Sequence, residues 1–201
     1  AMCLEVQAGV RPELRLVVMS ATLDGERLAN YMAAPRITSE GRSFPVEVSY
    51  LPLRARETPA LQFKRAVGQA LDETDGDILC FLPGKAEIER SARLLEDTDV
   101  AVEILHGELG MEEQARVLRP STTRRIVLAT NVAESSVTLP GVRAVVDIGL
   151  AREPRFDATS GMSRLETVNI AQSSARQRAG RAGRVAAGRC YRLWSQSTVL
   201  D

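Results

Sequence analysis

The sequence predicts an α/β fold in which a parallel sheet is flanked by helices. Short runs rich in Val, Ile and Leu are typical of buried strands, because β-branched runs of this length suit a sheet that is covered on both faces. These runs occupy residues 14–19, 77–82, 100–105, 125–129 and 143–148. Segments with helical periodicity separate most of them, and such alternation is typical of βαβ units.

Three helices are expected between these strands. Thr58 and Pro59 are typical of an N-cap and a first helical position, so they predict a helix over residues 60–73. Apolar residues at helical spacing predict two further helices, over residues 86–96 and 111–118.

The pattern divides the chain into three parts. Residues 1–40 hold one expected strand and a helix near residues 24–32, which is too little for a core, so we expect them to be the end of a preceding domain. Residues 41–57 are predicted to form an extended connector, and residues 58–201 a domain of their own. Within that domain, apolar residues alternate along residues 150–170 and predict a β-hairpin that projects from the sheet.

Composition excludes several classes of protein. The chain has 201 residues, no net charge, 44% hydrophobic and 26% charged residues, which is ordinary for a soluble globular protein. No apolar run approaches the roughly 20 residues of a membrane span, and no signal-peptide pattern opens the sequence. Cys3, Cys80 and Cys190 lie far apart, so free thiols in a reducing compartment, a cytoplasmic location and no membrane contact are expected.

Two kinds of site are missing from the sequence. Gly84 and Lys85 form the only Gly-Lys pair, but Leu79 stands where a P-loop needs its first glycine and Ala86 where it needs Ser or Thr. His106 is the only histidine, so no metal cluster is predicted.

Arginines gather near the C-terminus. No Asp or Glu occurs over residues 167–200, a segment that holds Arg176, Arg178, Arg181, Arg184, Arg189 and Arg192. Such a cluster suits phosphate binding. If only the number of arginines is considered, a basic helix face exposed to solvent is the simpler explanation. Because the chain has only two lysines, arginine is its usual cation.

The order of residues within this cluster favours phosphate binding. Arg178, Arg181 and Arg184 are spaced three apart, and residues at this spacing share a helix face. Planar guanidinium groups bind phosphate oxygens in a bidentate manner and stabilise charge on a transferred phosphoryl group. A solvated helix explains the arginines but not Gly180 and Gly183, which weaken a helix.

The segment QRAGRAGR, residues 177–184, resembles motif VI of the superfamily 2 DEAH/RHA-type helicases. Other segments resemble further motifs of that family in the right order. They are Ser20-Ala-Thr22 for motif III, ILCFLPGKAEIE at 78–89 for motif IV, LHGEL at 105–109 with Glu113-Gln114 for the following segment, LATNVAESSVTL at 128–139 for motif V, and VVDIG at 145–149. These matches cover nearly the whole chain, and SEGRSFPVE at 39–47 resembles the bacterial HrpB-type members.

The resemblance implies a RecA-like sheet of the P-loop NTPase type, the second RecA-like or helicase C-terminal domain, preceded by a remnant of the first that includes motif III. It implies an ATP-dependent helicase that acts on single-stranded or partly duplex nucleic acid, RNA in preference to DNA. ATP and Mg²⁺ would be used by the intact protein, with the Mg²⁺ ligands in the first RecA-like domain, which is also the expected partner. Without a P-loop or a DEAH metal site, this fragment is expected to be inactive alone.

The resemblance also assigns roles to residues. Gln177, Arg181 and Arg184 would be catalytic, facing the ATP phosphates, with the arginines as fingers and Gln177 orienting water. Three positions would lie at the nucleotide: Arg178, Asp147 and Leu150. Since many eukaryotic relatives have an aromatic residue where Leu150 stands, base selectivity is left open.

The remaining roles concern nucleic acid and coupling. Thr130, Asn131, Gly84 and Lys85 would contact nucleic acid, and the hairpin would lie where the duplex is split. Ser20 and Thr22 would couple the ATP state to domain movement. Simple helix caps remain an alternative explanation for Ser20, Thr130 and Asn131.

Two other functions stay open on the sequence. One is a non-catalytic module with a helicase-like fold that docks nucleic acid or protein. The other is a DNA translocase that does not separate strands. An upstream GxxxxGK[ST] motif and a DExH motif would distinguish the motor from the docking module.

Overall fold

The computed structural model describes residues 2–19, 25–37, 44–135, 137–157, 159 and 161–200. The chain forms two compact units, Ala1–Gly41 and Arg42–Asp201. In the first unit, α1 spans Met2–Gly9 and α2 spans Gly25–Met32, which confirms the helix expected near residues 24–32. The strand expected over residues 14–19 is wrong, because these residues form no strand and are largely exposed. A lone strand has no partner for its backbone groups among the described residues of this unit.

The second unit is built on a six-stranded sheet in the order β1-β8-β5-β2-β4-β3. All neighbouring pairs are parallel. The strands are β1 (Val46–Tyr50), β2 (Asp77–Phe81), β3 (Ala101–Leu105), β4 (Arg125–Ala129), β5 (Val142–Asp147) and β8 (Gly188–Arg192). The α/β class with a parallel sheet is therefore confirmed.

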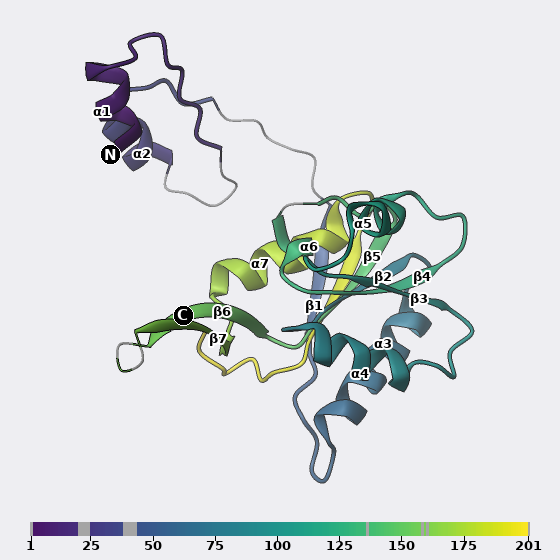
Figure 1. Ribbon diagram of the computed structural model, residues 1–201. Coiled ribbons are helices and arrows are strands. Elements are labelled where there is room, and N and C mark those ends of the chain that lie inside the picture. The colour runs from purple at the N-terminus through teal and green to yellow at the C-terminus, as the bar shows by residue number, and fades with distance from the viewer. Residues whose placement is uncertain are drawn as a thin grey trace. The chain divides into compact units, whose positions relative to one another are not determined.

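Helices cover both faces of this sheet (Figure 1). On one face, α3 (Pro59–Glu73) and α4 (Lys85–Leu94) pack against alternate strand residues such as Ile78 and Ile126. On the other face, the intervening residues such as Leu79 and Val127 contact α5, α6, α7 and a short 3-10 turn, η1. These elements span Met111–Leu118, Val132–Ser135, Gln172–Gly180 and Arg181–Gly183.

Two neighbouring arginines tie the helices to the amino ends of the strands. Arg124 donates to the carbonyls of Leu71 and Gly76, both at 2.9 Å, and so holds the end of α3. Arg125 is almost fully buried and pairs with Asp77 and Glu103, again at 2.9 Å each. These bonds fix the register of β4 against the strands on either side of it.

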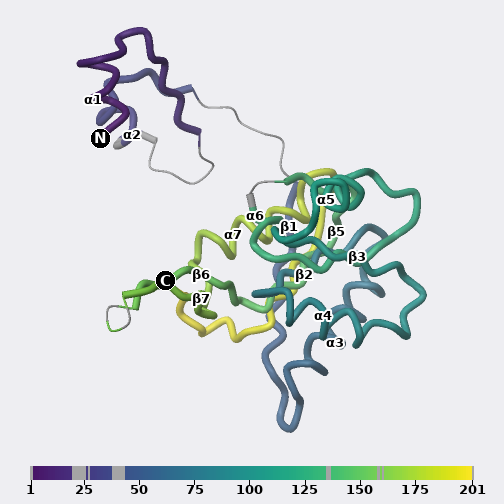
Figure 2. The backbone as a smooth tube through the Cα atoms, in the orientation of Figure 1, coloured from purple at the N-terminus to yellow at the C-terminus, as the bar shows by residue number. Residues whose placement is uncertain are grey.

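The predicted hairpin is present as a separate two-stranded sheet. Strands β6 (Leu150–Asp157) and β7 (Met162–Asn169) are antiparallel, and most of their side chains are exposed. Figure 2 shows the pair extending away from the parallel sheet, as the alternating pattern predicts.

Two strands lie where none was expected. Residues 41–57 were expected to form a connector, but Val46–Tyr50 is the edge strand β1 and pairs with β8. Strand β8 itself contains only two apolar residues, Cys190 and Tyr191, both fully buried. In the described part of the chain, no helix is long and apolar enough to cross a membrane.

Candidate functional site

The carboxyl ends of the central strands lie level with each other. The register pairs Phe81 with Ala129 and with Asp147, and pairs Leu105 with Ala129. The loops that follow these strands therefore emerge at one edge of the sheet, the usual location of ligand sites in open α/β sheets. This carboxyl edge holds the predicted nucleic-acid contacts, which lie in the loops after β2 and β4.

Gly84 and Lys85 follow β2 and begin α4. Gly84 is the N-cap, and an added Cβ would lie 2.9 Å from Nε of Arg152, which belongs to the hairpin strand β6. Arg152 also reaches Glu87 at 3.5 Å. The side chain of Lys85 is exposed, with Nζ 3.6 Å from Oε2 of Glu108. The base of the hairpin thus rests against the loop after β2.

Thr130 and Asn131 follow β4 and begin α6. Their carbonyls accept hydrogen bonds from the amides of Ala133 and Glu134 at 3.1 and 2.9 Å, and the amide of Thr130 donates to Leu105. Asn131 is exposed and Thr130 is partly exposed. Both residues therefore support the first turn of α6 through their backbone carbonyls.

The three residues expected at the nucleotide come together around Arg178. This arginine of α7 is only 1% exposed and lies 4.8 Å from the ring centre of Phe81. Its guanidinium donates to Oδ1 of Asp147 at 3.0 Å and to the carbonyl of Leu150 at 3.2 Å. It also donates to Oε2 of Glu134 at 3.0 Å. Arg178 therefore acts as a buried support that joins α6, α7, β5 and β6.

Asp147 is fully buried at the end of β5. Its Oδ1 also accepts from the amide of Gly149 at 2.9 Å. Burial raises the pKa of the Asp147 carboxyl above its ordinary value, and the charge of Arg178 acts in the opposite direction. Gly149 has a φ of +78°, and a Cβ there would lie 2.8 Å from the ring of Trp194. Glycine is therefore needed for the turn that leads into the hairpin.

Arg181 is held by backbone carbonyls. Its Nε donates to the carbonyl of Glu134 at 2.9 Å, and its terminal nitrogens donate to the carbonyls of Glu134 and Val137. Burial lowers the pKa of the Arg181 guanidinium to about 10, with a further contribution from the charge of Arg184. Arg181 thus remains a cation at neutral pH, in a direction fixed by α6 and the loop after it.

Arg184 is exposed, with Nη1 3.1 Å from Oγ1 of Thr138. Gln177 lies on the same helix as Arg178 and is partly exposed. The two glycines of the segment differ. An added Cβ at Gly183 would lie 2.5 Å from the carbonyl oxygen of Phe44, whereas at Gly180 it would meet nothing within 4 Å. Close packing against the chain before β1 therefore accounts for Gly183.

Glu134 is a site residue that was not predicted from the sequence. Its side chain binds Arg178 and its carbonyl binds Arg181, so it connects two of the predicted arginines. Glu134 is the only acidic residue over residues 128–139, and this isolated charge was the available signal. Ser20 and Thr22 lie outside the residues that the structure describes.

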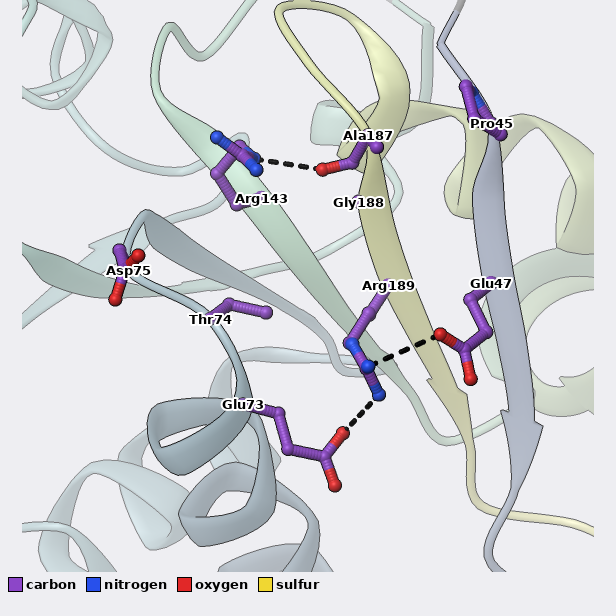
Figure 3. Close-up of a pocket in the computed structure, with 9 residues that line it drawn as sticks. All are labelled: Pro45, Glu47, Glu73, Thr74, Asp75, Arg143, Ala187, Gly188 and Arg189. Atoms are coloured by element: carbon purple, nitrogen blue, oxygen red, sulfur yellow. Dashed lines mark hydrogen bonds and ion pairs between the residues drawn. The ribbon is translucent and has the colours of Figure 1, made fainter.

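A pocket of about 430 Å³ lies at the opposite edge of the sheet, where the strands begin (Figure 3). Arg189 crosses it between Glu47 and Glu73, at 3.3 and 2.5 Å. The Tyr191 hydroxyl donates to Glu73 at 2.7 Å, and this bond is the main reason that the pKa of Glu73 is lowered. None of the predicted site residues lines this pocket. Across the described ranges, no three His, Cys, Asp or Glu side chains gather to hold a metal ion.

Known proteins share this arrangement. The family model described as "Helicase conserved C-terminal domain" matches residues 62–186. The chain is 44% identical to "ATP-dependent RNA helicase HrpB" of Escherichia coli over 194 residues, which are 94% of this chain and 24% of that protein. It is 43% identical to "ATP-dependent RNA helicase DEAH12, chloroplastic" of Arabidopsis thaliana, covering 93% of this chain and 11% of that protein.

A solved structure gives the same result. The crystal structure of the Escherichia coli DEAH/RHA helicase HrpB matches with a TM-score of 0.87 and 42% identity, over 97% of this chain and 26% of that one. The expected RecA-like sheet with its hairpin is thereby confirmed. The chain spans about a quarter or less of these relatives. The family match, the fold and the ordered motifs together show that this chain belongs to the helicase conserved C-terminal domain family, in the form found in DEAH/RHA helicases.

Proposed function

We propose that this chain is part of an ATP-dependent RNA helicase and supplies one half of its ATP site and part of its nucleic-acid track. The observation that carries the proposal is the position of α6. This short helix directly follows Thr130 and Asn131 on the carboxyl edge, and its Glu134 holds Arg178 and Arg181. One element therefore joins the candidate nucleic-acid loop to the candidate phosphate-binding arginines.

In the proposed ATP site, Arg181 and Arg184 contact the phosphates and Gln177 orients the attacking water. Arg181 is 4% exposed and two uncharged carbonyls hold it in one direction, so its positive charge is not neutralised by a carboxylate there. Arg184 is exposed, so the pair suits charge stabilisation during phosphoryl transfer. Since the Arg178 guanidinium is occupied by Glu134 and Asp147, we propose that it shapes the nucleotide face with Asp147 and Leu150.

ATP supplies the transferred phosphoryl group, and Mg²⁺ would neutralise its charge. Guanidinium groups fit phosphate oxygens, and the two carboxylates beside them, Glu134 and Asp147, are paired with Arg178. Among the described residues, no three His, Cys, Asp or Glu side chains gather to hold the ion. We therefore propose that the Mg²⁺ ligands belong to the first RecA-like domain, across the nucleotide from the second domain. Ser20 and Thr22 would couple that domain to the ATP state.

In the proposed nucleic-acid track, Thr130, Asn131, Gly84 and Lys85 contact the sugar–phosphate backbone. Short polar side chains, loop amides and one exposed lysine suit contacts that do not read sequence. The hairpin lies against the loop after β2 through Arg152, and this contact supports a position beside the proposed track. Single-stranded or partly duplex RNA is the proposed substrate. Three free cysteines suit a reducing compartment, and we propose the cytoplasm.

The test compares the intact protein with this 201-residue chain. ATP hydrolysis is measured without nucleic acid and with RNA or DNA of matched length and sequence. The proposal expects stimulation of the intact protein by RNA above that by DNA, and no turnover by the chain alone. Stimulation by neither polymer would support a docking module instead, and equal stimulation by both would remove the preference for RNA.

A further inference from the structure

The outer edge of the sheet at β3 presents unpaired backbone groups. Strand β3 is the last in the sheet order and pairs only with β4. The carbonyl of Leu105 accepts from Thr130 of the β4 side at 3.2 Å. The N–H and C=O groups of one strand residue point to the same side, and those of the next residue point to the opposite side. Since Leu105 points toward β4, the backbone groups of Ile104 and Val102 point away from it. Nothing in the described part of the chain pairs with them there.

A groove of about 300 Å³ runs along this edge. Its lining includes Val102 and Ile104 of β3, Glu89 of α4, and Glu113 and Arg116 of α5. Since α4 and α5 cover opposite faces of the sheet, the groove follows the edge itself. An unpaired strand edge of this kind is a template for an added strand.

The walls of the groove are acidic. Glu89 and Glu113 are exposed, although Oε2 of Glu113 accepts from the amide of Gly110 at 3.2 Å. Arg116 is the one cation among the groove's lining residues. The remaining carboxylate, Glu103, is already paired with Arg125 at 2.9 Å. This charge repels phosphate backbones and favours Lys or Arg side chains.

His106 gives a second indication of a ligand. It lines the groove and is 7% exposed, yet its Nδ1 is buried without a hydrogen-bond partner among the described residues. Buried ring nitrogens normally have a partner. His106 is the residue that directly follows β3, so this unpaired nitrogen belongs to the end of the open edge.

We propose that the β3 edge binds an extended segment of a partner protein as a seventh strand, with Lys or Arg side chains beside Glu89 and Glu113. Backbone pairing with Val102 and Ile104 would provide affinity, and the acidic walls would provide selectivity. Nucleic acid is disfavoured by the same walls. A second copy of this chain is also disfavoured, because pairing two β3 edges would bring the acidic walls together.

The probe is a capped peptide that repeats Val-Lys-Lys, which places lysines on both faces of an added strand, and amide hydrogen exchange of the chain is followed by NMR. Bound peptide should slow exchange at the Val102 and Ile104 amides by about tenfold or more at saturation, because exchange then requires the added strand to leave. The matched peptide is methylated on every backbone nitrogen, which removes the donors from both of its edges, and it should leave these amides unchanged.

Charge is tested with the E89Q and E113Q double variant, whose peptide affinity should fall by about fivefold, as expected for two exposed ion pairs. Glu112→Gln, at an exposed position of the same helix outside the groove, should leave affinity unchanged. Unchanged exchange at Val102 and Ile104, or equal slowing by the methylated peptide, would overturn the proposal. Slowing by an RNA oligonucleotide instead, or by higher protein concentration alone, would overturn it in favour of nucleic acid or a second copy.

Discussion

The backbone carbonyl of Glu134 accepts a hydrogen bond from Nε of Arg181 at 2.9 Å, while its side chain binds Arg178 at 3.0 Å. One residue of α6 therefore fixes two arginines through different atoms. The carbonyl contact does not depend on which side chain stands at position 134. The side-chain contact does, so the two contributions can be separated by mutation.

Glu134→Gln should lower the free energy of unfolding by about 1–2 kcal/mol. The variant replaces a largely buried ion pair with a hydrogen bond between the Arg178 cation and an uncharged amide. Urea denaturation of the chain measures the change. The matched variant is Glu166→Gln, whose partner Arg164 is exposed, and its effect should stay below about 0.5 kcal/mol. Equal losses in both variants would show that Glu134 has no special structural role.

Arg178→Met should cost about 3–5 kcal/mol near neutral pH, because it leaves the Asp147 carboxylate buried and unpaired. Arg176→Met, at an exposed position of the same helix, should change stability by less than about 0.5 kcal/mol.

The cost of Arg178→Met should also depend on pH. Burial raises the folded-state pKa of Asp147, so its contribution to stability is present below the unfolded pKa and is lost as the pH rises. Removing the Arg178 charge, which opposes this rise, should raise the pKa further. The variant should therefore lose less stability at about pH 5 than at about pH 8, counted from an unfolded pKa of about 3.9. A loss that does not change with pH would contradict the pairing.

Gly183→Ala and Gly180→Ala should have opposite effects. At Gly183 the new Cβ would lie 2.5 Å from the carbonyl oxygen of Phe44 and 2.7 Å from Cγ2 of Val46, so we expect a loss of about 1–3 kcal/mol. At Gly180 the Cβ would meet no atom within 4 Å, so alanine should be neutral or stabilising by about 0.4–1 kcal/mol. Thermal and urea unfolding of both variants check this, and a similar loss in the two would refute the packing explanation for Gly183.

The elements with regular apolar patterns could be predicted from the sequence. The helix over residues 111–118 matches α5, and the runs that became β2 to β5 were recognised because both of their faces are covered. Strand β8 escaped detection because long-range ion pairs accommodate Arg189, with Glu47 and Glu73 as partners. Local sequence spacing does not reveal such pairs.

Residues 14–19 show the opposite case, in which an apolar run that predicts a strand does not form one. No strand pairs with this run in the described part of its unit. The arginines of the site were recognisable from their spacing, but their environments were not. Arg178 and Arg184 lie six residues apart, yet one is buried among carboxylates and the other is exposed. That difference depends on α6 and β5, which are distant in sequence.

The central claim is that this chain contributes arginine fingers to ATP hydrolysis, and Arg184→Ala in the intact protein tests it most directly. RNA-stimulated kcat should fall by about 10³ or more, by comparison with arginine fingers in general, while stability stays unchanged because the side chain is exposed. Arg176→Ala, on an exposed position of α7, should hydrolyse ATP normally. A near-normal kcat in the Arg184→Ala protein would contradict the assignment.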